Sequence, residues 1–151
     1  MLLLSEFRAY VTECVNAIPE LQHGKVVMDD GQITKFLKDE VKTTDNHILM
    51  AIIPKHNPFG DVDMLQTRNT AAFLVLKKID RSDVTHDQYL DMLEQSQLAT
   101  KKLWDKMLTD HLNAGENCNI MGKLKIDTLD INPVWGLASC DGYEIDFSLD
   151  T

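Results

Sequence analysis

Apolar side chains recur at every third or fourth position in two N-terminal stretches, which is the spacing of an amphipathic helix. Ser5 can cap a first helix that runs to about Ile18, and Pro19 ends it. A second helix is predicted after Asp30, while Lys25–Met28 between the two can form a short strand. The apolar stripes consist of Phe7, Val11, Cys14, Val15 and Ile18 in the first helix and of Ile33, Phe36, Leu37 and Val41 in the second.

Two apolar runs in the middle of the chain predict a pair of buried strands. Ile48–Ile53 is continuous and ends at Pro54, as expected of a strand that is covered on both faces, and Ala71–Ile79 is the second run. The polar connection between them is Lys55–Asn69. Loops of more than about twelve residues are uncommon in small domains and are usually either functional or disordered. We interpret this connection as an arm that becomes ordered against a partner, and a mobile loop without a role is the alternative.

The clearest helix begins after Thr85. Thr85 and Gln88 form a capping box, in which each side chain can bond a backbone amide of the other's residue. The helix is predicted to continue to about Leu112, and at 1.5 Å per residue it spans about 40 Å. Trp104 lies off the main apolar stripe, so it either widens the buried face or marks a contact surface.

The last third of the chain has the alternating pattern of β-strands. Met121–Ile131 alternates and then shifts phase, which predicts a bulge or a bend. In the final strand Tyr143, Ile145, Phe147 and Leu149 share one face, opposite a row of acidic and polar residues on the solvent side: Glu144, Asp146, Ser148 and Asp150. That row suits a solvated face, an edge strand protected from aggregation, or a surface that meets a basic neighbour. Trp135 is expected in a turn that closes the end of the sheet, with a binding role as the alternative.

The order of these elements is helix, helix, strand, strand, helix, strand, strand. It predicts an α+β fold in which a mostly antiparallel sheet of four or five strands carries one long helix across it, with two N-terminal helices. The length of 151 residues and the apolar content of 44% suit a single domain over residues 1–151. A chain of this size closes a hydrophobic core without a metal ion or a disulfide.

The formal charge of −9 disfavours nucleic acid and membrane surfaces as partners, because both attract clustered lysine and arginine. It suits a basic protein partner. Cys14, Cys118 and Cys140 show no Cys-x-x-Cys spacing, so we expect reduced thiols and a cytoplasmic protein. Met1–Leu4 is too short for a signal sequence, and no apolar run approaches the ~20 residues of a membrane helix.

The sequence contains no phosphate-binding glycine motif and no nucleophile elbow. His56, Asp61 and Asp63 have side chains that could hold a divalent ion, but spacing alone fixes no geometry, and we favour a solvated loop. Cys140 could act as a nucleophile only beside a positioned base, so a packed thiol is the favoured interpretation. We therefore predict no catalytic residue, no cofactor and no metal site.

The order of elements resembles that of the tail-terminator and tail-completion proteins of long-tailed phages and contractile injection systems. The stretch Asn132–Leu137 followed by Asp141–Phe147 is similar to the endings of small prophage-encoded proteins. The resemblance implies a non-enzymatic structural subunit that caps or joins a tail tube as a homo-oligomeric ring, commonly a hexamer. Its partners would be copies of itself and tail-tube or sheath proteins, and it would be assembled into a virion or tail-like particle.

We expect the interface to combine the long connection, the two tryptophans and the acidic row. Its candidate residues are Phe59, Asp61, Asp63, Met64, Leu65, Trp104, Trp135, Glu144 and Asp146. An acidic immunity or inhibitor protein that masks a basic toxin or enzyme is the alternative function. An enzyme with an unrecognised site near His56, Asp61 or Cys140 is a third possibility.

Overall fold

The computed structural model describes the chain except for residue 118 and the side chains of residues 116 and 117. The prediction for Cys118 therefore lies outside the described residues. The helices are α1 (Leu4–Ala17), α2 (Asp30–Asp39), α3 (His86–Leu112) and the short α4 (Ala114–Asn117). The strands are β1 (Leu21–Val27), β2 (His47–Phe59), β3 (Gln66–Lys78), β4 (Leu124–Leu137) and β5 (Cys140–Asp150).

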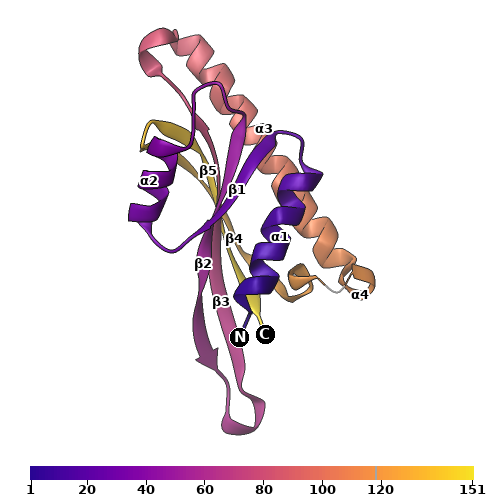
Figure 1. The fold of residues 1–151 in the computed structure, drawn as a ribbon. Coiled ribbons are helices and arrows are strands. Elements are labelled where there is room, and N and C mark those ends of the chain that lie inside the picture. The colour runs from indigo at the N-terminus through magenta and orange to yellow at the C-terminus, as the bar shows by residue number, and fades with distance from the viewer. Residues whose placement is uncertain (118) are drawn as a thin grey trace.

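The described strands form one sheet in the order β1-β2-β3-β5-β4 (Figure 1). The α+β class and the single long helix are confirmed, and the capping box of Thr85 and Gln88 opens that helix. The sheet is mixed, however, because β1 runs parallel to β2 while the other neighbours are antiparallel. A parallel pair needs a crossover connection, and α2 provides it. The two N-terminal helices are therefore separated by a strand.

The helices cover opposite faces of the sheet. α1 and α3 pack on one face, where the rings of Phe7 and Phe73 lie 5.7 Å apart and those of Phe73 and Phe147 lie 4.8 Å apart. α2 packs on the other face through Ile33 and Leu37. Because β2 and β3 are covered on both faces, Ile48, Met50, Leu74 and Leu76 are buried as well as the residues that alternate with them. This confirms the interpretation of the continuous apolar run.

α1 begins two residues earlier than predicted and is capped differently, with Leu3 in place of Ser5 at the N-cap. Ser5 lies inside the helix, and the carboxylate of Glu6 accepts a hydrogen bond from the backbone N–H of Leu3 at 3.0 Å. The helix is held against α3 by a polar cluster at its buried side. The Tyr10 hydroxyl donates to Asp110 at 2.8 Å, and the Lys106 ammonium lies 2.8 Å from the same carboxylate. Burial raises the pKa of Tyr10, which therefore stays protonated.

The predicted irregular connection Lys55–Asn69 is mostly strand. β2 continues past Pro54 to Phe59, and β3 begins at Gln66, so only residues 60–65 lie outside the ladder. Pro54 is tolerated because the register of the pair shifts between Ile52 and Lys55, where the missing N–H disrupts no regular pairing. The paired strands extend as a hairpin, here called the arm (residues 55–70), from one end of the molecule (Figure 1).

The C-terminal strands form a tight hairpin. The phase shift in the sequence corresponds to a register shift between Lys125 and Asp130 in β4, so the predicted irregularity of this strand is confirmed. β4 and β5 are joined by Ala138 and Ser139, whose φ angles of 49° and 64° are the left-handed values that a two-residue hairpin turn requires. Trp135 lies in β4 and not in a turn, so its predicted place was wrong. β5 lies between β3 and β4, and the interpretation of its acidic row as an edge was also wrong.

Candidate docking surfaces

The predicted interface residues lie at separate places on the molecule. Phe59, Asp61, Asp63, Met64 and Leu65 are together in and beside the turn at the tip of the arm. Trp104 is on α3 and Trp135 is on β4. Glu144 and Asp146 are on β5, inside the sheet. The candidates therefore form no single surface, and each group has to be judged by its own surroundings.

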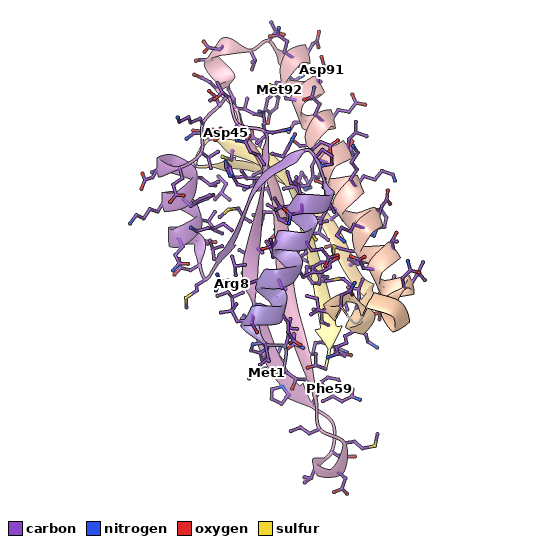
Figure 2. The ribbon with its side chains drawn as sticks, turned by 45° about the vertical axis from the view of Figure 1, so that its right-hand side comes forward. Met1, Arg8, Asp45, Phe59, Asp91 and Met92 are labelled. Carbon is purple, nitrogen blue, oxygen red and sulfur yellow. The ribbon has the colours of Figure 1, made fainter. Side chains whose placement is uncertain are left out.

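The arm tip, defined here as residues 59–65, exposes a group of apolar side chains. Phe59 is 37% exposed, Met64 73% and Leu65 67%, and Val62, which the sequence reasoning omitted, is 97% exposed. Figure 2 shows the side chains of the tip projecting beyond Phe59, clear of the helices. The tip turn needs glycine at Gly60, where φ is +96° and an added Cβ would lie 2.6 Å from the Met64 carbonyl oxygen. Because contiguous exposed apolar patches are typical of interaction sites, the tip is a candidate contact surface.

The base of the arm is fixed by the buried side chain of Asn69. Its oxygen accepts hydrogen bonds from the Leu2 backbone N–H at 3.0 Å and from His56 Nδ1 at 2.7 Å. Its amide nitrogen donates to the Leu149 carbonyl oxygen at 2.7 Å. Thr67 also exchanges two backbone hydrogen bonds with Thr151, of 2.7 and 2.8 Å. These contacts bind the arm to residues near both ends of the chain, so it projects in a defined direction.

A salt bridge adds to the stiffness of the arm. The guanidinium of Arg68 donates two parallel hydrogen bonds to Asp150, both of 2.9 Å, and lies 5.2 Å from the centre of the Phe59 ring. A bidentate pair of this kind fixes orientation as well as distance. Phe59 is therefore held at the root of the tip, while the three apolar residues beyond it stay exposed.

The metal interpretation of His56, Asp61 and Asp63 gains no support from their positions. The His56 ring is hydrogen-bonded to Asn69 at the arm base, whereas the two aspartates belong to the tip. Among the side chains that the structure describes, which leave out residues 116–118, no group of three or more histidine, cysteine, aspartate or glutamate residues is placed to hold a metal ion.

A second exposed apolar feature is a groove between α3 and the β4–β5 hairpin. It has a volume of about 480 Å³, and Leu98, Trp104, Ile131 and Tyr143 line its apolar part. Leu98 is 55% exposed and Ile131 36%, so its walls are open to solvent. Trp104 packs partly against the core, as one of the two alternatives from the sequence predicted, and it also lines the groove. Trp135 lies further along β4 and is 68% exposed.

The acidic row on β5 is not the solvated face that its alternation predicted. Glu144 and Asp146 are half-buried on the side of the sheet that α2 covers only in part. Burial raises the pKa of both carboxyl groups, and the charge of Asp146 raises the pKa of Glu144 further. Asp130 pairs directly across from Asp146 and adds to the repulsion. The row is thus a less accessible partner surface than the arm tip.

Two buried polar clusters were not predicted from the sequence. Asp141 is 1% exposed and accepts hydrogen bonds from Arg81 at 2.8 Å, from the Tyr89 hydroxyl at 3.1 Å and from the Gly136 backbone N–H at 2.7 Å. These partners are far apart in the chain and carry no shared motif. The cluster fixes the start of α3 to the β4–β5 turn.

The second buried cluster is centred on His47. Its Nε2 atom lies 2.9 Å from Ser96 Oγ, and its Nδ1 atom lies 3.0 Å from Asn46 Oδ1. Burial lowers the pKa of His47 to about 4, and the charge of Lys77 adds to the effect. Serine beside histidine is the pairing of a hydrolase nucleophile, but Ser96 is fully buried and no substrate can reach it. The pair therefore serves packing between β2 and α3.

The two described cysteines are packed inside the protein. Cys14 and Cys140 are both fully buried and free of disulfides. Burial raises the pKa of Cys14 to about 12 and that of Cys140 to about 11. Because the thiolate is the reactive form, neither thiol is suited to act as a nucleophile.

Comparison with known proteins gives no identification. No protein-family model matches the chain, and no curated protein matches it in sequence. Within the described residues, no helix has both the length and the apolar character needed to span a membrane.

Proposed function

We propose that this chain is a non-enzymatic assembly subunit that forms a homo-oligomeric ring of the phage tail-terminator kind. The observation that carries the proposal is the arm, a stiff hairpin that holds exposed apolar side chains away from the body of the protein. An isolated subunit gains no stability from such a tip, because its apolar side chains remain in water. A subunit that buries the tip against a neighbour does gain from it.

The order of elements supports the same proposal. The paired strands β2 and β3, the long helix α3 and the C-terminal hairpin β4–β5 are the elements on which the resemblance to tail terminators depends. In such a ring each subunit uses two different surfaces, one for each neighbour. The ring closes when the rotation from one subunit to the next adds up to a full turn. The rigid sheet would serve as the platform, and tail-tube or sheath proteins would be the further partners.

The alternative of an acidic inhibitor has weaker support. It depends in part on a charged strand face that meets a basic partner, and Glu144 and Asp146 on that face are half-buried. An inhibitor would remain a monomer and bind one basic protein in a complex that weakens with added salt. A ring subunit would instead associate with itself through apolar contacts that salt affects little.

Native mass spectrometry and electron microscopy of the purified chain, alone and with isolated tail tubes, test the proposal. We expect one closed oligomer of fixed subunit number, seen as rings that cap tube ends. The matched control replaces residues 59–66 by Asn-Gly, which joins the cross-strand pair Pro58 and Thr67 through a tight turn. This shortened chain should fold but fail to assemble. A strict monomer that also ignores the tubes would refute the proposed function.

A further inference from the structure

We infer that the arm tip of one copy docks in the groove between α3 and β4 of the next copy. This inference rests on the proposed function and assigns the two surfaces that a head-to-tail ring requires. The tip is a convex apolar feature and the groove is a concave one, and both belong to the same chain. Complementary surfaces at different places on one protein produce a heterologous contact that continues from subunit to subunit.

The tip has the composition of an interface anchor. Val62, Met64 and Leu65 are each at least 67% exposed, and they are adjacent in a short turn that the strands hold in place. Methionine suits this position because its flexible side chain adapts to the shape of a partner. Since the arm is already ordered, docking costs little conformational entropy, which strengthens binding.

The groove offers a matching apolar receptor. Its walls are formed by Leu98 and Trp104 from α3 and by Ile131 and Tyr143 from the strands. Its volume of about 480 Å³ lies within the roughly 300–1,000 Å³ typical of ligand-binding clefts. Tryptophan and tyrosine, which are enriched at the centres of interfaces, are both present.

The charges at the groove give the docked tip one direction. Glu94 and Lys101 line the same side of α3, two helical turns apart, so that the groove has an acidic end and a basic end. The Lys101 side chain is 61% exposed, and its one ion pair among the described residues is with Asp105, which is 55% exposed, at 2.6 Å; an exposed pair of this kind contributes little. The tip carries Asp61 and Asp63 and no basic residue. Its two carboxylates therefore fit the Lys101 end and would be repelled at the Glu94 end.

The tip cannot reach the groove of its own chain. The arm is fixed at Asn69 and extends along β2 and β3 beyond the helices (Figure 1). Figure 2 shows the tip at one end of the molecule and Asp91 and Met92, which are on α3 near the groove residue Glu94, toward the other. The contact is therefore between copies.

Disulfide trapping tests the contact directly. In a chain whose Cys118 is replaced by serine, Met64→Cys and Leu98→Cys together place one thiol on each surface. Mild oxidation should then link the tip of each copy to the groove of the next and produce a ladder of linked chains. The buried Cys14 and Cys140 do not react, so the links can form only between the introduced thiols. Chains with only one of the two introduced thiols serve as controls and should give no ladder. A double variant that also gives none would overturn the inference.

Mixing two blocked variants gives a second, independent test. Val62→Asp should disable the tip, and Leu98→Arg should disable the groove. Each should weaken self-association at least tenfold, as measured by analytical ultracentrifugation. The control variant Met28→Asp changes an exposed apolar residue elsewhere and should have no effect. An equimolar mixture should form one-to-one pairs and no larger species, because each variant keeps one intact surface. Circular dichroism confirms that all three remain folded.

The two tests separate this inference from the proposed function. If the wild-type chain forms a ring but both blocked variants do so equally well, the docking inference is wrong and a ring built through other surfaces stands. If the wild-type chain stays monomeric in the ultracentrifuge, the docking inference is also wrong. Tube binding then decides the proposed function independently.

Discussion

Acidification should weaken the folded protein through His47. The ring lies 3% exposed between β2 and α3, and burial lowers its pKa to about 4, whereas histidine in an unfolded chain titrates near about 6.5. Between these two values the unfolded chain binds a proton that the folded chain does not. Stability is therefore full above about pH 6.5 and is lost as the pH falls toward 4.

The size of the loss follows from the two pKa values. Between pH 7.5 and pH 5.0, the difference in proton binding removes about 2 kcal/mol from the free energy of unfolding, and about 3 kcal/mol is lost by pH 4. For a domain of this length, a loss of 2 kcal/mol lowers Tm by about 4–8 °C. It also lowers the urea midpoint by about 1 M.

Urea unfolding followed by circular dichroism, at pH 7.5 and pH 5.0, measures the loss in the wild-type chain and in a His47→Gln variant. The variant keeps a buried polar group that does not ionise, so the difference between the two chains isolates His47. Glu144 and Asp146 act in the opposite direction, because their raised pKa values favour the folded state as the pH falls. Equal pH dependence of the two chains, or a His47 imidazole that titrates near pH 6.5 by nuclear magnetic resonance, would refute the reasoning.

Two further substitutions test the packing of β5 against β3 and the buried hydrogen bonds of Asp141. Gly142→Ala should lower the free energy of unfolding, measured with urea, by about 3 kcal/mol, because the new Cβ would lie 1.9 Å from the Val75 carbonyl oxygen. The control is Gly115→Ala, which should be nearly neutral because an added Cβ there has no neighbour within 4 Å. Asp141→Asn should cost about 2 kcal/mol by weakening the hydrogen bonds from Arg81, and thermal unfolding with an unchanged Tm would contradict that role.

The elements with strong local signals were predicted well from the sequence. The helix after Thr85 has a capping box and a long apolar stripe, and the run Ile48–Ile53 has too many apolar residues for a surface strand. The sequence predicted β1 only in part. The central residues of this strand are exposed, and its apolar and polar positions follow neither the alternation of a strand nor the spacing of a helix. Its parallel pairing with β2 depends on the crossover through α2, which no local pattern reveals.

The arm and the groove show why the candidate surfaces were predicted only in part. The arm strands are polar and contain proline, so they have the composition of a loop although they are paired. Its tip was singled out by Phe59, Met64 and Leu65, while Val62 was overlooked between two aspartates. The groove joins Leu98 to Ile131, which are far apart in the sequence, and only the packing of α3 across the sheet brings them together.

The attachment of the arm to Leu2 and Thr151 has a practical consequence for anyone who labels this protein. Both ends of the chain emerge beside the root of the arm (Figure 1). A fluorescent fusion or a bulky purification tag at either end would crowd the hairpin and hinder whatever approaches it. Failure of a tagged preparation to form the proposed assembly would then report an obstruction and not a property of the untagged chain.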